Sequence, residues 1–240
     1  MQRTISTSLI LITLAAGAAV AGRESHDYPI YANGGVPDLT VDAHRFTSQM
    51  EIVDRVFDPV ADRCAVDEGV IGGTGVRRLL RFDTVIVNVG DGDLVVGRRD
   101  DSTNPYAPYF FFGACHGHYH IRDFSVYELL TPDGQVVVTG HKQGFCFEDS
   151  FKYGPNRSSG YDCGNQGITS GWGDWYYKQL VGQWIDITGV PEGDYIVRVR
   201  INLGADGTGI FPEGQNRAVN QVETRIHIPG PRHKVALATD

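Results

Sequence analysis

Three histidines occupy alternate positions in the segment HGHYH, as His116, His118 and His120. On a β-strand, residues i, i+2 and i+4 project from the same face, so we expect the three imidazole rings to converge. Bringing three imidazoles together is costly unless an ion or another partner satisfies them. A set of three histidines suits copper(II) or zinc and leaves positions open for water or substrate. The spacing therefore predicts a transition-metal site, with a solvated polar strand face as the alternative.

A lysine in the segment TGHKQGFCFED, Lys142, is the second candidate for chemistry. The chain has 17 arginines and only 4 lysines, so a lysine between apolar stretches indicates a chemical role that arginine could not fill. Unlike arginine, lysine can lose its proton when it is buried or lies beside a cation. The alternative is an ordinary surface lysine.

The run Trp172-Gly173-Asp174-Trp175-Tyr176-Tyr177 is the third candidate, because it places one carboxylate within an aromatic cluster. The alternative is a loop that packs into the core.

The elements that must position these residues are β-strands. Val197, Val199 and Ile201 alternate with two arginines, which is typical of a half-buried strand. Turn signals, including Pro132-Asp133-Gly134, separate further extended stretches, and helical periodicity is weak throughout. We expect strands within the stretches 76–89, 94–97, 109–112, 118–130, 136–138, 184–187, 195–201 and 222–228. The fold class predicted from this pattern is all-β, a β-sandwich-like single domain with long irregular loops.

One of those loops is residues 148–172, which are rich in Gly, Ser, Asn and Asp. The segment is too long and polar for a simple hairpin, and loops of this length are usually functional or fastened to the rest of the fold.

The composition of the 240-residue chain agrees with a turn-rich globular protein, since it contains 30 glycines and 11 prolines. The 21 basic and 29 acidic residues give a net charge of -8. This sign disfavours nucleic acid as a partner and favours cationic partners.

The first 21 residues have the features of a secretory signal peptide. Arg3 supplies the positive charge, residues 9–20 are apolar, and Ala19-Val20-Ala21 forms a small-x-small cleavage site. Cleavage removes one positive charge, so the mature net charge becomes -9. We therefore expect a secreted protein with no stable membrane insertion after signal cleavage, while an uncleaved anchor is the alternative. The predicted segments are the signal peptide 1–21, an N-terminal tail 22–36, one main domain 37–229 and a C-terminal tail 230–240.

Four cysteines, an even number, suit two disulfides in an oxidising compartment. They are Cys64, Cys115, Cys146 and Cys163. Their positions alone leave three pairings open.

Taken together, these stretches resemble the catalytic domain of the lysyl oxidase family. The segment CHGHYHIRDFSVYELL is similar to that family's copper-binding segment, and GHKQGFCFED is similar to the segment with its cofactor lysine. The segment GQWIDITGVPEGDYIVRVRIN resembles the family's C-terminal strands, and weaker similarity extends upstream through RCAVDEG and RRLLRF. The resemblance covers roughly residues 37–229. It implies a copper-dependent amine oxidase with a self-derived lysine tyrosylquinone.

Residue by residue, the resemblance assigns His116, His118 and His120 to copper(II). It assigns Lys142 and Tyr176 to the quinone crosslink, with the adjacent Tyr177 as the rival tyrosine.

The resemblance also implies a disulfide pairing. Cys115 and Cys163 match a pair found in the family. Cys64 and Cys146 each match a cysteine whose usual partner is missing here, so we expect these two to pair with one another.

The implied reaction consumes a primary amine, either a peptidyl lysine of a cationic protein or a small amine, together with molecular oxygen. It releases an aldehyde, hydrogen peroxide and ammonia. A general base must remove a proton from the substrate carbon, and Asp174 is our hypothesis for it. The alternative is that Asp174 forms an Asx-type turn. Two rival functions remain: a non-catalytic secreted copper- or zinc-binding β-sandwich module, and a zinc hydrolase with three histidine ligands.

Overall fold

The computed structural model describes residues 28, 30, 32, 34–140, 144–154, 158–214 and 220–230. The predicted signal peptide, Lys142, part of the predicted N-terminal tail and all of the predicted C-terminal tail except residue 230 lie outside these residues. Within the described residues, no helix has the length and apolar character needed to cross a bilayer.

The described part of the chain is mostly strands with little helix, so the predicted all-β class is confirmed. The elements, in chain order, are β1 (Leu39–Val41), α1 (Ala43–Ser48), β2 (Glu51–Phe57), α2 (Arg63–Asp67), β3 (Gly75–Arg81), β4 (Thr84–Asn88), β5 (Leu94–Gly97), the 3-10 helix η1 (Ala107–Tyr109), β6 (Phe110–Gly113), β7 (His118–Ile121), β8 (Ser125–Leu130), β9 (Val136–Gly140), β10 (Phe151–Lys152), β11 (Gln166–Ile168), β12 (Trp172–Tyr176), β13 (Trp184–Asp186), β14 (Gly193–Ile201) and β15 (Gln221–Ile228).

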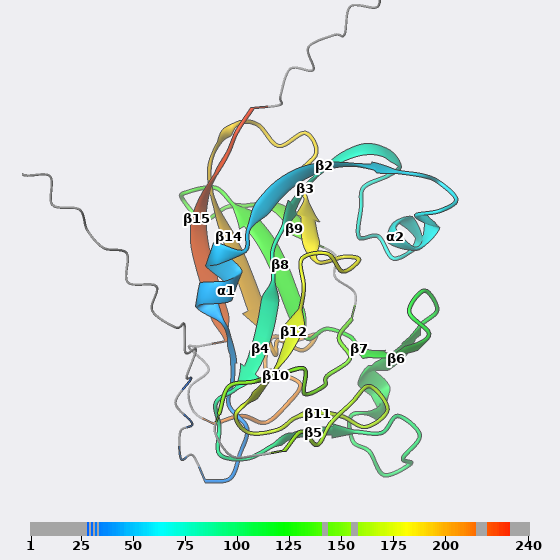
Figure 1. Cartoon of the computed structure of the whole chain (residues 1–240), viewed down its shortest axis with the longest axis vertical. Coiled ribbons are helices and arrows are strands. Elements are labelled where there is room, and N and C mark those ends of the chain that lie inside the picture. The colour runs from blue at the N-terminus through cyan, green and yellow to red at the C-terminus, as the bar shows by residue number, and fades with distance from the viewer. Residues whose placement is uncertain are drawn as a thin grey trace, which may run out of the picture.

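Two four-stranded antiparallel sheets form the main body (Figure 1). One has the strand order β15-β14-β8-β9, and the other has the order β1-β4-β12-β10. One apolar cluster joins them, because it contains Ile86 of β4 and Tyr176 of β12 as well as Leu129 of β8 and Val197 of β14. Burying one face of each sheet against the other is the main stabilising contribution available to this arrangement.

The alternation predicted for residues 195–201 is confirmed in β14. Val197, Val199 and Ile201 are buried, while Arg198 and Arg200 both bind the carboxylate of Glu128 on the neighbouring strand β8. A buried glutamate is tolerated there because two guanidinium groups satisfy it, and they hold the pKa of Glu128 below its usual value against the opposing effect of burial.

Smaller sheets flank this body: β13-β3-β2, β11-β5 and the hairpin β6-β7. Two predicted continuous stretches are divided in the structure. Residues 76–89 form β3 and β4, and residues 118–130 form β7 and β8, with Asp123 between them at a φ of 60°. In Figure 1 the β6–β7 hairpin lies to the right of the two main sheets.

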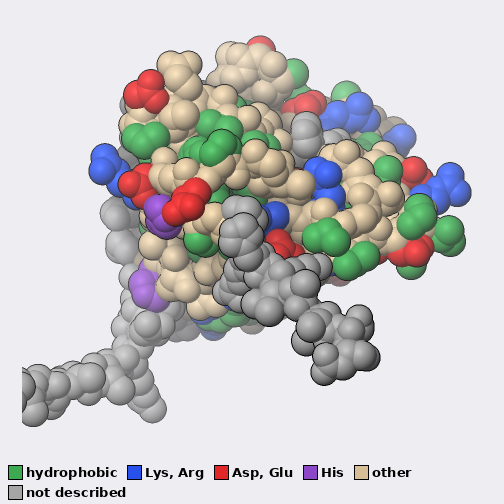
Figure 2. Space-filling model, turned by 90° about the horizontal axis from the view of Figure 1, so that it is seen from above, with side chains coloured by type: hydrophobic (Ala, Val, Ile, Leu, Met, Phe, Trp, Pro, Cys, Tyr) green, Lys and Arg blue, Asp and Glu red, His purple; other side chains and the backbone are tan. Residues whose placement is uncertain are grey.

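Charged side chains do not form a basic stripe on the face that Figure 2 shows. Blue Lys and Arg side chains lie scattered among acidic and apolar ones.

Candidate active site

The three histidines lie on the β6–β7 hairpin, but not all on its strand. His118 and His120 belong to β7, whereas His116 lies in the turn before it. The prediction of a single strand for the three is therefore wrong for His116. The backbone N–H groups of His116 and Gly117 both donate to the carbonyl of Gly113, and Gly117 has a φ of 73°, which favours glycine. This tight turn folds the His116 ring back toward the strand.

The three rings still gather in one place. Their centroids are 4.6 Å apart for His118 and His120, 5.1 Å for His116 and His120, and 6.0 Å for His116 and His118. The Nε2 atoms of His118 and His120 are 2.8 Å apart, so one donates a hydrogen bond to the other. Three imidazoles that bind one ion through nitrogens about 2.1 Å from it have ring centroids roughly 4.5 to 6 Å apart, depending on the angle between the ligands. The spacing of the three rings is therefore close to what one copper(II) or zinc ion requires.

Glu68 is a neighbour of this set that the sequence did not reveal. Its Oε2 atom lies 3.2 Å from Nε2 of His116, and it follows α2 directly. A disulfide joins Cys64 of α2 to Cys115, the residue before His116, with 5.7 Å between their Cα atoms. This bond fixes α2 against the histidine turn and brings the Glu68 carboxylate to the ring.

The second disulfide joins Cys146 to Cys163, with 5.3 Å between their Cα atoms. Both predicted pairings, Cys115 with Cys163 and Cys64 with Cys146, are therefore wrong. The physical reason is that Cys115 lies in a turn against α2, whereas Cys146 and Cys163 belong to adjacent segments. Those segments are joined by the hydrogen bond from the Gly167 N–H to the Phe147 carbonyl. The prediction that residues 148–172 are fastened down is consistent with this second bond.

Asp174 and Tyr176 lie two residues apart on β12 and therefore share one face of the strand. The Tyr176 hydroxyl donates to Asp174 Oδ2 at 2.5 Å, and it lies 2.9 Å from the carbonyl oxygen of Cys146. Burial and the neighbouring Asp174 carboxylate raise the pKa of Tyr176 well above its usual value. Asp174 is buried within a strand, so the alternative of a turn-forming role is wrong.

Tyr177 differs from Tyr176 in its surroundings. Its side chain is 44% exposed, and its ring lies 4.4 Å from that of Trp175, centroid to centroid. Tyr176 is only 8% exposed and packs against Phe145.

One cavity of about 520 Å³ brings these groups together. Its wall includes the three histidines, Asp174, Tyr176 and Tyr177. The two cysteines of the second disulfide, Cys146 and Cys163, also line it. Three carboxylates line it (Glu68, Glu148 and Asp174), and no lysine or arginine does among the described lining residues. The cavity therefore favours a cationic occupant, and the Glu148 carboxylate further raises the pKa of Tyr176.

Glycine at position 144 allows the chain to pass directly over the metal-site candidate. A Cβ on Gly144 would lie 2.4 Å from Cβ of His120, which is too close for any side chain. Lys142 precedes Gly144 by two residues but lies outside the described residues.

Sequence reasoning missed Glu68, Glu148 and Gln166. The buried Gln166 amide donates to the Tyr119 carbonyl and accepts from the Phe147 N–H, so it ties the histidine strand to the segment after Lys142. The only signal available was proximity in sequence, since Glu148 follows Cys146 by two residues and Glu68 follows Cys64 by four.

One known protein family matches most of this chain. A sequence model of the lysyl oxidase family matches residues 57–217, which is more than half of the chain. The chain belongs to the lysyl oxidase family. The resemblance seen in its motifs is thus confirmed.

Several animal members of the lysyl oxidase family are similar to this chain. Lysyl oxidase homolog 2 of Bos taurus is 36% identical over 178 residues, which cover 69% of this chain and 22% of that protein. Lysyl oxidase homolog 3 of Homo sapiens is 40% identical over 153 residues, which cover 58% of this chain and 19% of that protein. Lysyl oxidase homolog 2A of Danio rerio is 37% identical over 183 residues, which cover 71% of this chain and 23% of that protein. The alignments therefore span about a fifth of the length of these relatives.

Proposed function

We propose that this chain is a secreted, copper-dependent amine oxidase whose catalytic domain spans residues 37–229. It converts primary amines, either peptidyl lysine or small amines, to aldehydes with release of hydrogen peroxide and ammonia. Its cofactors are copper(II) and a lysine tyrosylquinone made from Lys142 and Tyr176. Membership of the lysyl oxidase family supports an amine-oxidase type of activity.

The observation that carries this proposal is the shared cavity. The histidine cluster comes from the β6–β7 hairpin, and the Tyr176–Asp174 pair comes from β12, yet both line the same space. A module that only stores metal has no need of a buried tyrosine hydrogen-bonded to a carboxylate at its metal site.

His116, His118 and His120 would hold the copper, since neutral imidazole nitrogens suit copper(II). When bound, copper and oxygen would supply the oxidising power that cofactor formation requires, and the finished quinone would supply an electrophilic carbonyl for the substrate amine.

The chain's own residues perform the proton transfers. Burial keeps the Tyr176 hydroxyl protonated, and Asp174 Oδ2, 2.5 Å away, is the acceptor positioned to take that proton. In turnover, Asp174 is our proposed base for the α-proton of the substrate, because its carboxylate lines the cavity. The cavity wall also attracts the substrate ammonium through Glu68 and Glu148, while Leu180 and Val181 offer apolar surface to the carbon chain.

The proposed role of Lys142 rests on its position in the sequence. It precedes Gly144 by two residues, and Gly144 lines the cavity against His120. Two residues of chain reach at most about 7 Å between Cα atoms, and a lysine side chain adds further reach.

Mass spectrometry of copper-loaded, aerobically purified protein tests the proposal. We expect a crosslinked Lys142–Tyr176 peptide and a visible quinone absorption that phenylhydrazine bleaches. Lys142→Arg should abolish peroxide release from amines while copper content stays unchanged, and Tyr177→Phe should retain the crosslink that Tyr176→Phe loses. Intact separate peptides after copper and oxygen would overturn the proposal and favour the non-catalytic secreted copper- or zinc-binding module.

A further inference from the structure

The Cys146–Cys163 disulfide lies inside the cavity, against one of the histidines. A ring nitrogen of His118 and the two sulfur atoms all lie within 4.8 Å of one another. In the disulfide the sulfurs are poor ligands, because the thiolate is the form that binds metal. We propose that opening this disulfide creates a second metal site, in which Cys146, Cys163 and His118 bind a thiophilic cation such as zinc(II).

The opening step is a two-electron reduction by a small dithiol. The Cys146–Cys163 sulfur–sulfur bond breaks, the dithiol is oxidised to its cyclic disulfide, and its two protons pass to the two cysteine sulfurs. Both cysteines line the cavity, which gives the reductant a route to them. Zinc binding then releases the two thiol protons to solvent.

The donor set suits zinc in kind and in spacing. Zinc binds thiolates at about 2.3 Å and imidazole nitrogens at about 2.0–2.1 Å. Three donors that already lie within 4.8 Å of one another can therefore reach one ion through small side-chain movements. The Glu148 carboxylate is close enough to be the fourth ligand of a tetrahedral site, since its Oε2 atom lies 4.0 Å from Cys163 Sγ.

The donors stay in place without the disulfide because each segment is held independently. The Cys146 carbonyl interacts with the Tyr176 hydroxyl, and the next residue, Phe147, is bonded to the Gln166 amide.

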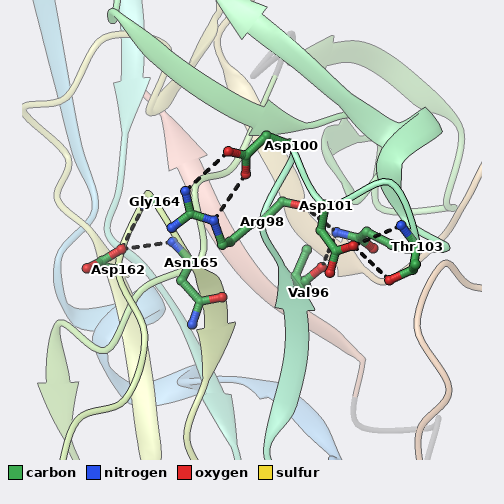
Figure 3. A network of polar contacts seen from close by, with 9 residues as sticks. Val96, Arg98, Asp100, Asp101, Thr103, Asp162, Gly164 and Asn165 are labelled. Carbon is green, nitrogen blue, oxygen red and sulfur yellow. Dashed lines mark hydrogen bonds and ion pairs between the residues drawn. The ribbon is translucent and has the colours of Figure 1, made fainter.

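The loop with Cys163 has its own support (Figure 3). The Asp162 side chain accepts hydrogen bonds from the N–H groups of Gly164 and Asn165, which closes a turn around Cys163. These two hydrogen bonds lower the pKa of Asp162, and the positive charge of Arg98, which is paired with Asp100 beside this turn, lowers it further. Reduction therefore exposes two thiols that remain near His118 instead of releasing a free loop.

This site has a consequence for the histidine cluster. His118 belongs to both sets, so a zinc ion that binds it together with the two thiolates takes one ligand away from the other two histidines. The redox state of one disulfide would then decide which class of metal the cavity holds. This inference goes beyond the proposed oxidase activity and does not require the quinone to form.

Thiol alkylation of the full-length protein tests the proposal directly. The protein is reduced with a dithiol under anaerobic conditions, the reductant is removed, and iodoacetamide labelling is followed by peptide mass spectrometry with and without zinc(II). We expect zinc to slow alkylation of Cys146 and Cys163 by at least about tenfold. Cys64 and Cys115, which are reduced in the same sample, should react equally fast in both conditions and serve as the internal control.

Cobalt(II) gives a second readout, because thiolate ligation produces a near-ultraviolet charge-transfer band. The double variant Cys64→Ser/Cys115→Ser should retain this band after reduction, and Cys146→Ser/Cys163→Ser should lose it. Equal alkylation of all four cysteines with and without zinc would overturn the proposal. Loss of the folded circular dichroism spectrum on reduction would overturn it as well, since the site requires both segments to stay in place. Neither result would bear on the Lys142–Tyr176 crosslink, which is measured in oxidised protein.

Discussion

The hydroxyl of Tyr176 donates a hydrogen bond of 2.5 Å to Asp174, two residues earlier on the same strand. Both side chains are buried, and both line the cavity that contains the three histidines. A phenol in such a place resists ionisation, because burial and the adjacent negative charge both disfavour the phenolate. The same carboxylate is the nearest acceptor for the proton once a cation in the cavity favours its loss.

Replacing Asp174 with asparagine removes that acceptor while keeping the size of the side chain. We expect Asp174→Asn to slow amine oxidation by at least about 100-fold, the usual contribution of a positioned base, with copper content unchanged. Peroxide release measures turnover, and the fraction of crosslinked peptide measures cofactor formation. Asp206→Asn is the control, because Asp206 is exposed and only caps the N–H and hydroxyl of Thr208. Turnover of Asp174→Asn equal to that of the wild type would exclude the base role.

The sequence predicted the components of this site better than their arrangement. The strand alternation of residues 195–201 depends only on local side-chain pattern, and it was correct. The histidine spacing identified a cluster, but it could not show that a turn at Gly117 takes His116 off the strand.

The disulfides show the same limit more clearly. Four cysteines allow three pairings, and the choice depends on which distant segments the fold brings together. The position of Glu68 beside His116 depends in turn on the Cys64–Cys115 bond. Contacts of this kind arise from tertiary packing and leave no periodic signal in the chain.

Glu68 should strengthen the metal site through His116. A carboxylate that accepts a hydrogen bond from a ligating histidine fixes the orientation and tautomer of its ring, and its loss commonly costs 10- to 100-fold in metal affinity. We therefore expect Glu68→Ala to weaken copper binding by about that factor in a chelator competition. The adjacent variant Asp67→Asn is the control, because Asp67 forms an exposed ion pair with Arg63 on the same helix. Equal affinities for the two variants would show that Glu68 does not orient the ring.

Gly144 should tolerate no side chain. A Cβ at this position would lie 2.4 Å from His120 Cβ and 2.6 Å from its Nδ1 atom, so the backbone or the ring must move. We expect Gly144→Ala to lower the free energy of unfolding by about 1–3 kcal/mol, as overpacking does, and to reduce copper affinity. Urea unfolding and metal titration measure the two effects. Gly193→Ala is the control, since its nearest contact is an ordinary 3.5 Å to the Tyr195 ring; an equally stable Gly144→Ala would contradict the close approach.

Alkaline pH should reveal the buried tyrosine Tyr127, which is 1% exposed and donates a hydrogen bond to Gln183. Burial raises its pKa above the usual value of 10.0. The unfolded chain then loses the phenolic proton before the folded chain does, so stability falls as the pH rises above about 10, by up to about 1.4 kcal/mol per pH unit for this group. Tyr127→Phe removes this titration. At pH 8 it also lowers the free energy of unfolding by about 1 kcal/mol, because the hydrogen bond to Gln183 is lost. We therefore expect the variant to be less stable than the wild type at pH 8, with the difference shrinking or reversing at pH 10.5. Urea unfolding at the two pH values checks this, and a constant difference would mean that Tyr127 ionises equally easily in both states.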